Sequence, residues 1–264
     1  MLLLPLLLLL AALSLPIVSA LTQLGAFGTP GIGEVASRFP TLIGAAGYAF
    51  SIWGLIFVLV VALGIWQLLP ANRMHPLLRI VQIPASLAFL LCAIWMPVFT
   101  AGAFHLAAAL LVVAAILLLY CLLQLQPARH GSRAEKILLW AQGSLFAAWV
   151  TLAAALNLAQ LRAATGLLSS VPLLAFSLGL LLAAGTVLAI VNHRQRGNPV
   201  WVATAVWALL AIFVQQSAAG TRDAAITGCS ALALAGLLLL QLVWLMRAQR
   251  ARPAQVPDSA GVPA

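Results

Sequence analysis

The chain contains eight long apolar segments, and they limit what it can fold into more than any other feature. They cover residues 2–22, 43–69, 77–100, 103–125, 137–160, 167–191, 200–216 and 224–246. A bilayer core of about 30 Å is crossed by roughly 20 apolar residues in a helix, so each segment is long enough to cross. Only 6% of the residues are charged, which excludes a water-soluble globule. The sequence therefore predicts an all-α polytopic membrane bundle of eight transmembrane helices.

Basic residues gather on one side of this predicted bundle. Eight spans would place three loops and the C-terminal tail on that side: 70–76, 126–136, 192–199 and 247–264. Together with the adjoining Arg79, these segments hold ten of the thirteen Lys and Arg residues. The positive-inside rule then predicts that both termini are cytoplasmic. Because the charges are spread over short loops, we expect no nucleic-acid partner. Twelve Arg against one Lys favours a bacterial plasma membrane.

The first apolar segment has two interpretations. MLLLPLLLLLAALSLPIVSA ends in a small-x-small pattern that a signal peptidase could accept. No Lys or Arg precedes the apolar run, and this favours a retained helix over a cleaved signal. If residues 1–20 were removed, seven spans would remain and the same loops would still be cytoplasmic.

The second segment differs from ordinary lipid-facing helices because it opens with glycines and aromatic residues. Gly44, Gly47 and Gly54 would let helix backbones approach closely. Aromatic side chains set between them could line a shaped cavity, and Phe50 and Trp53 are candidates. Lipid contact alone would not require this composition.

The eight tryptophans fall into two groups by depth. Four lie within a few residues of cytoplasmic span ends and are predicted to be interface anchors: Trp66, Trp140, Trp201 and Trp244. Trp53 and Trp149 lie about ten and twelve residues into their helices, near the midplane, which an interface role does not explain. Trp95 and Trp207 are ambiguous.

The fifth segment shows the clearest helical pattern. Aromatic and polar side chains share one face: Gln142, Phe146, Trp149, Ala153, Asn157 and Gln160. Small residues at four-residue spacing form a second, packing face: Ala147, Thr151, Ala155 and Ala159. The glutamines are equally well explained as hydrogen-bond partners of neighbouring helices. Asn157 is favoured as a functional residue, because polar groups deep in a membrane tend to be functional.

Three segments then carry a resemblance to a known family. They are Ala148–Asn157 (AWVTLAAALN), Trp95–Phe99 (WMPVF) and Gly47–Trp53 (GYAFSIW). In their order along the chain, these segments resemble motifs of the TspO/MBR family of tryptophan-rich sensory proteins, which includes the mitochondrial translocator protein. Residues 33–57 also resemble a longer subgroup of that family with additional helices. The third motif lacks one residue between Phe50 and Trp53.

The resemblance implies both an organisation and a site. It implies a five-helix unit over residues 1–160 and three additional transmembrane helices over 161–246, and the proline-containing segment 247–264 is predicted to be a disordered tail. The family binds porphyrins such as protoporphyrin and haem, and in some members sterols, beneath the loop that is here 23–42. A homodimer is also implied, and no cofactor is required. The ligand-binding positions would be Tyr48, Phe50, Trp53, Trp95, Phe99, Phe146, Trp149, Ala153 and Asn157.

The chain departs from the family pattern at three places. Cys92 stands where the family usually has Asn, Leu145-Phe146 replace a Pro-Tyr pair, and Ala45-Ala46 replace a double proline. These changes remove hydrogen-bonding and helix-initiating features, so they bear on ligand identity more than on fold.

Two other function classes find less support in the sequence. An ion-coupled transporter generally places a carboxylate, His or Lys inside the membrane, but the acidic residues here fall in loops or the tail. An enzyme is not expected, because no Ser or Cys can be paired with a buried His or acid. The prediction is an integral membrane sensory protein that binds a flat apolar ligand, for sensing or facilitated movement. A transporter without an evident coupling residue and a structural membrane scaffold are the alternatives.

Overall fold

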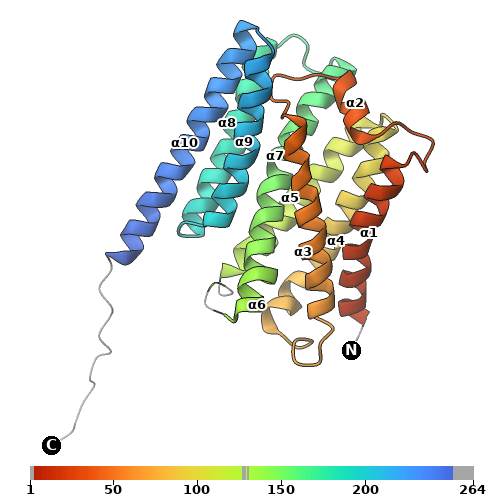
Figure 1. The fold of residues 1–264 in the computed structure, drawn as a ribbon, viewed down its shortest axis with the longest axis vertical. Helices are drawn as coiled ribbons and strands as arrows, with labels where there is room; N and C mark the ends of the chain where they lie inside the picture. The colour runs from red at the N-terminus through yellow and green to blue at the C-terminus, as the bar shows by residue number, and fades with distance from the viewer. Residues whose placement is uncertain (1–2, 127–128, 130, 252–264) are drawn as a thin grey trace, which may run out of the picture.

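The protein is described here from a computed structural model, which covers residues 3–126, 129 and 131–251. Within these residues it is an all-helical bundle with eight helices long and apolar enough to cross a membrane, as predicted (Figure 1). The spanning helices are α1 (Leu3–Gln23), α3 (Ile52–Trp66), α4 (Pro76–Thr100), α5 (Phe104–Gln124), α7 (Gln142–Thr165), α8 (Leu173–Arg194), α9 (Pro199–Ala218) and α10 (Arg222–Arg250).

Short helical elements extend α3 and α7 at their N-terminal ends, and one further short helix lies between α1 and α3. The 3-10 helix η1 (Gly47–Ser51) leads into α3, so the second span begins four residues later than the sequence predicts. The elements α6 (Arg133–Glu135) and the π-helical η3 (Lys136–Ala141) precede α7, and this span therefore begins earlier than predicted. A seven-residue helix, α2 (Ile32–Arg38), lies between α1 and α3.

Helix α10 is longer than its apolar segment. It continues through Arg250, so residues 247–250 of the predicted tail are helical. Arg and Gln are good helix formers, and basic side chains near a helix C-terminus interact favourably with its dipole. Residues 252–264, the rest of the predicted disordered tail, lie outside the described part of the chain.

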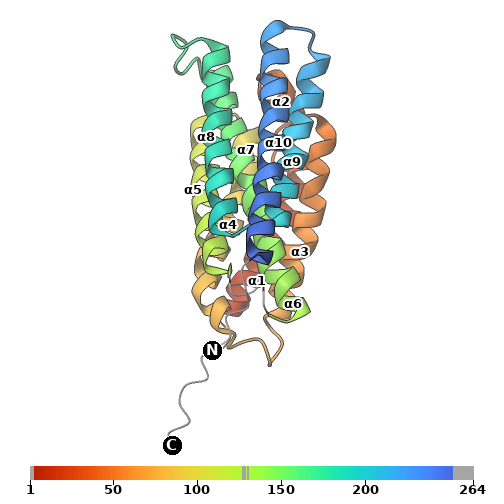
Figure 2. The same ribbon diagram turned by 90° about the vertical axis from the view of Figure 1, so that its left-hand side faces the viewer.

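Helix α7 occupies the middle of the bundle. It packs against α5 on one side and α9 on the other, and it also contacts α3 and α8 (Figures 1 and 2). Helices α1, α4 and α5 pack in succession on the first side, and α8, α9 and α10 lie on the second. One continuous buried core runs from Leu8 of α1 to Leu238 of α10. Side chains of α7 therefore meet helices from both ends of the chain, while the predicted boundary at residue 160 stays a prediction.

A network of amide side chains holds the turn between α8 and α9 inside the bundle. Asn198 accepts a hydrogen bond from the backbone N–H of Trp201, which caps α9, and its Nδ2 donates to Ser144 Oγ of α7 at 2.7 Å. Gln195 Nε2 donates to the carbonyl oxygen of Leu122 at 2.9 Å. Buried amides must find partners in a membrane protein, so these bonds fix the last three helices against the first five.

Trp201 belongs to this buried region, and its prediction as an interface anchor is wrong. Its side chain is 0% exposed, and Nε1 donates to the carbonyl oxygen of Leu188 at 3.0 Å. Trp244, by contrast, is 62% exposed near the end of α10, as an interface residue would be. Position along a helix does not tell which face a side chain takes, and this is why the two residues differ.

Helices α1 and α3 approach each other closely at Gly64. A Cβ built on Gly64 would lie 2.8 Å from Leu9 Cδ1 and 3.1 Å from Leu9 Cα. Gly47 and Gly54, which the sequence suggested as contact points in place of Gly64, have no heavy atom within 4 Å of such a Cβ. The small-residue contact therefore lies near the C-terminal end of α3, and not at the glycine-rich start of the segment.

Gly64→Ala is expected to destabilise the bundle by about 1–3 kcal/mol, because a backbone atom cannot move aside as a flexible side chain can. Gly54→Ala, the same change on the same helix, is the matched control. It should be neutral or gain up to about 1 kcal/mol, since glycine is a poor helix former. Unfolding of both variants in detergent, followed by circular dichroism, checks this. Equal stability of the two variants would contradict the close approach.

Candidate functional site

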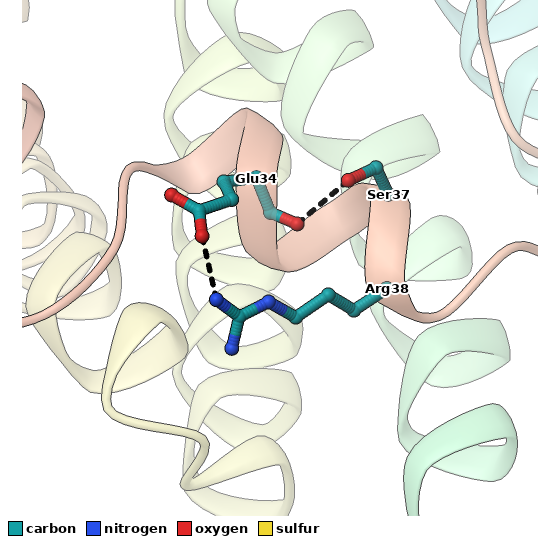
Figure 3. Close-up of polar contacts among 3 residues, drawn as sticks. All are labelled: Glu34, Ser37 and Arg38. Carbon is teal, nitrogen blue, oxygen red and sulfur yellow. Dashed lines mark hydrogen bonds and ion pairs between the residues drawn. The ribbon is translucent and has the colours of Figure 1, made fainter.

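Helix α2 lies across one end of the bundle, and its two faces differ in character. Glu34 and Arg38 form an ion pair of 2.5 Å on the exposed face, as Figure 3 shows, and Ser37 Oγ donates to the Glu34 carbonyl oxygen. Val35, on the opposite face, is buried. An exposed i,i+4 pair contributes only about 0.3–0.5 kcal/mol, so the buried face and its contacts with α4 hold α2 in place.

The segment that contains α2 is fixed to α4 and α5 by two side-chain contacts. Thr29 Oγ1 and Thr100 Oγ1 share a hydrogen bond of 2.8 Å. The ring of Phe39 meets the edge of Phe104, with ring centroids 4.9 Å apart. Residues 24–46, here called the lid, therefore cover the end of the first helices instead of extending into solvent.

Helix α9 holds the other end of the lid. Gln216 Nε2 donates to the carbonyl oxygens of Gly44 at 3.0 Å and of Thr41 at 3.3 Å. The backbone N–H of Ala46 donates to the carbonyl oxygen of Ala211 at 3.0 Å. A helix from the C-terminal part of the chain thus anchors a loop from the N-terminal part.

The start of the second span also contacts α9. Trp207 Nε1 donates to the Ala49 carbonyl oxygen at 3.2 Å, and the Trp207 ring meets the edge of Tyr48 at 5.1 Å. These contacts fix η1, which contains Phe50 and leads directly into α3, the helix that carries Trp53. Trp207, ambiguous in the sequence, is therefore a packing residue between α9 and η1.

A cavity of about 710 Å³ lies beneath the lid. Its apolar wall comes from Phe50 and Trp53 of the second span and from Trp95 and Met96 of α4. Glutamines from three helices, together with hydroxyl groups, form the polar part of its lining: Gln23, Gln160, Gln215, Gln216, Ser19, Ser37 and Thr41. Among the described residues that line it, none carries a charge.

Trp53 of this wall also lies at the centre of an aromatic cluster that continues behind the wall. Its ring is stacked with Trp95 at 6.4 Å and 18° between the planes. Trp149 and Phe146 of α7 meet it edge-on, at 6.4 Å and 5.8 Å between ring centroids. Phe50 makes a further edge contact with Trp149 at 5.8 Å. The offset and edge-to-face arrangements are those that aromatic pairs prefer, so the cluster is rigid.

Asn157 orients the second tryptophan of the cluster. Trp95 Nε1 donates to Asn157 Oδ1 at 2.8 Å, and Asn157 Nδ2 donates to the Ala153 carbonyl oxygen of its own helix at 3.2 Å. Trp95 also packs against Phe99 at 5.5 Å, and Phe99 contacts Phe104, which holds the lid. Aromatic contacts therefore run without interruption from the lid to the centre of the bundle.

The predicted site residues separate into two groups and two single residues in the structure. Three of them line the cavity: Phe50, Trp53 and Trp95. Four lie behind that wall, in contact with its side chains: Phe99, Phe146, Trp149 and Asn157. Ala153 is half-buried and supports Asn157 through its carbonyl group. Tyr48 is separate, because it is 45% exposed and packs against Trp207.

Two further features of the site concern polar atoms. The Trp149 indole N–H is buried and has no hydrogen-bond partner among the described residues. Gln215 and Gln216 line the cavity from α9, and the sequence analysis did not predict them. Their signal was nevertheless present, since two adjacent amides near the end of an otherwise apolar span are unusual in a membrane helix.

Comparison with known proteins places this arrangement in a family. The sequence matches the family model described as TSPO-like protein over residues 5–244. That range reaches from α1 into α10 and includes the lid, the cavity residues and α9. No curated protein and no solved structure matches the chain.

Proposed function

Because this chain belongs to the TSPO-like family, as its three motifs predicted, we propose that it binds a flat, largely apolar small molecule beneath the lid. The molecule would be porphyrin-like or sterol-like, and binding would serve sensing or facilitated movement. The eight apolar helices and the family membership agree on an integral membrane protein. The binding step is the proposal.

The proposal of ligand binding rests on the volume and lining of the cavity. Its volume of about 710 Å³ lies within the roughly 300–1,000 Å³ of typical small-molecule sites. Phe50, Trp53 and Trp95 give the cavity an aromatic wall, and aromatic side chains offer the apolar contact area that a flat ring system needs. The cluster behind them is already packed, and a ligand would not have to order it on binding.

The lining favours the organic ring over a metal centre. Among the described lining residues there is no histidine, cysteine or carboxylate, and the Met96 thioether is the one soft donor. The lining would therefore offer haem iron no strong ligand, and haem would be held through contacts with its macrocycle alone. We propose that no cofactor is required. No group of three metal-ligating side chains occurs in the described residues either. We accordingly propose binding, not catalysis, as the activity.

The orientation and mode of action are proposed from the charges. The start of α1 and the end of α10 lie at the same end of the bundle, opposite the lid (Figure 1). Arg73 belongs to the loop between α3 and α4, and Arg194 and Arg196 lie at the turn between α8 and α9, so the order of the helices puts all three on this side. By the positive-inside rule this end is cytoplasmic, in a bacterial plasma membrane, and the lid faces outward. The described acidic residues Glu34, Glu135 and Asp223 lie at helix ends and not in the middle of a span, where a residue that couples transport to an ion would be expected. We therefore propose that any transport of the ligand runs down its own concentration gradient.

A homodimer remains a prediction from the resemblance.

A titration tests the proposed function. Purified protein in detergent should show saturable quenching of tryptophan fluorescence on addition of protoporphyrin IX dimethyl ester or of a fluorescent sterol. We expect one ligand per chain, because a single cavity is placed against Trp53 and Trp95. Quenching that rises linearly without saturation for porphyrin and sterol alike would contradict the proposal, since it would report partition into the micelle.

A further inference from the structure

We infer that the ligand of this cavity is electroneutral and carries hydrogen-bonding groups along one edge, where it meets a wall of glutamine amides. The inference rests on the proposed function and names the chemical class of its ligand. It separates uncharged molecules, with carbonyl, ester or hydroxyl groups, from carboxylated macrocycles of the same shape.

The cavity has a polar wall in addition to its aromatic one. Gln23 comes from the end of α1, Gln160 from α7, and Gln215 and Gln216 from α9. An amide both donates and accepts hydrogen bonds, so this wall can satisfy carbonyl, ester and hydroxyl groups alike. A ligand that filled the cavity with hydrocarbon alone would leave these amides without partners, which is unfavourable.

Gln160 is the amide most available to a ligand. Gln160 is only 5% exposed and lines the cavity, yet its side-chain amide makes no hydrogen bond within the described part of the chain. Gln216 differs, because its Nε2 already holds the lid through Gly44 and Thr41. Gln160 lies one turn beyond Asn157, so it continues the face of α7 that supports the aromatic wall.

The charged side chains closest along the chain to the lining do not themselves line the cavity, although Arg162 Nη1 is buried without a hydrogen-bond partner among the described residues. Arg162, two residues after Gln160, donates to the Val171 carbonyl oxygen and lies over the Phe176 ring at 4.7 Å. Arg38 pairs with Glu34 on the exposed face of α2 (Figure 3). Among the described residues that line the cavity, a bound carboxylate would therefore have no cationic partner. An unpaired buried charge is far more costly than a buried ester carbonyl.

A matched pair of macrocycles tests this inference. Protoporphyrin IX and its dimethyl ester share one flat ring and differ in the charge of two side groups. The ratio of their dissociation constants, from quenching titrations, should favour the ester by tenfold or more. Gln160→Lys should shift that ratio at least tenfold toward the diacid, because it supplies the missing cation. Partition of each ligand into detergent is the same for both proteins and cancels in the comparison.

Gln215→Lys provides a second variant that puts the same charge on an exposed part of the wall, should Gln160→Lys fail to fold. Wild type that binds the diacid as tightly as the ester overturns the inference and leaves the proposed function standing. An ester-to-diacid ratio that neither lysine variant changes overturns it too. If neither macrocycle quenches saturably, both the inference and the proposed porphyrin-like binding fail.

Discussion

Trp53→Ala is expected to weaken binding of protoporphyrin IX dimethyl ester by roughly 30-fold or more. Trp53 lines the cavity, and its ring also contacts the rings of three other residues: Trp95, Trp149 and Phe146. Truncating a buried aromatic anchor of a binding site typically costs about 2 kcal/mol or more, which corresponds to roughly this factor. Anisotropy of the porphyrin's own fluorescence measures the affinity without relying on the deleted indole.

Two other tryptophan variants sharpen this experiment. Trp244→Ala removes an indole that is 62% exposed on α10 and distant in sequence from the cavity wall, so affinity should not change. Trp149→Ala removes a ring behind the wall, and its effect should fall between the other two. Wild-type affinity in the Trp53 variant, or equal losses in all three, would mean that the ligand binds elsewhere.

Gln216→Ala is expected to loosen the lid. The variant loses the two hydrogen bonds that Nε2 donates to Thr41 and Gly44, and interhelical bonds of this kind contribute about 0.6–1.7 kcal/mol each. Amide hydrogen exchange over residues 40–46 should then become roughly tenfold faster, and ligand should dissociate faster by a similar factor. Exchange in the core of α7 should stay unchanged.

Gln215→Ala is the matched control for the lid. Gln215 is the neighbouring amide of α9 and also lines the cavity, but it makes no hydrogen bond to the lid in the described structure. Its exchange over residues 40–46 should match that of wild type. If the two variants exchange alike, the Gln216 bonds do not hold the lid.

Gly228→Ala offers an independent route to the same contact. A Cβ at Gly228 of α10 would lie 3.3 Å from Gln216 Cβ, so the methyl group would press on the side chain that holds the lid. We expect faster exchange over residues 40–46, smaller than in Gln216→Ala, because the amide can shift without losing both bonds. Unchanged exchange would show that α10 leaves room for the methyl group.

The sequence predicted the parts of the site that follow from local pattern. Helical spacing placed Phe146, Trp149 and Asn157 on one face of α7, and they do lie together behind the aromatic wall. The family resemblance placed Trp53 and Trp95 in one site, and the two rings are stacked. Periodicity is sufficient to predict which side chains share one face of a helix, because that face is fixed by the spacing of residues along the chain.

The contribution of α9 could not be predicted in this way. Gln216 bonds to Gly44, a residue 172 positions earlier in the chain, and no local pattern specifies such a pairing. Tyr48 turned toward Trp207 because the second span begins as a 3-10 helix, whose three-residue turn rotates side chains away from α-helical positions. Trp201 was misplaced for a related reason, since depth along a helix does not specify the face.

The position of a bound macrocycle decides whether the ligand lies beneath the lid. An experimental structure of the complex with protoporphyrin IX dimethyl ester should show the ring beneath α2, within about 4 Å of Trp53 and with one edge toward Gln160. A macrocycle bound only to the outer, lipid-facing surface of α8 or α10, with none beneath the lid, would contradict the account.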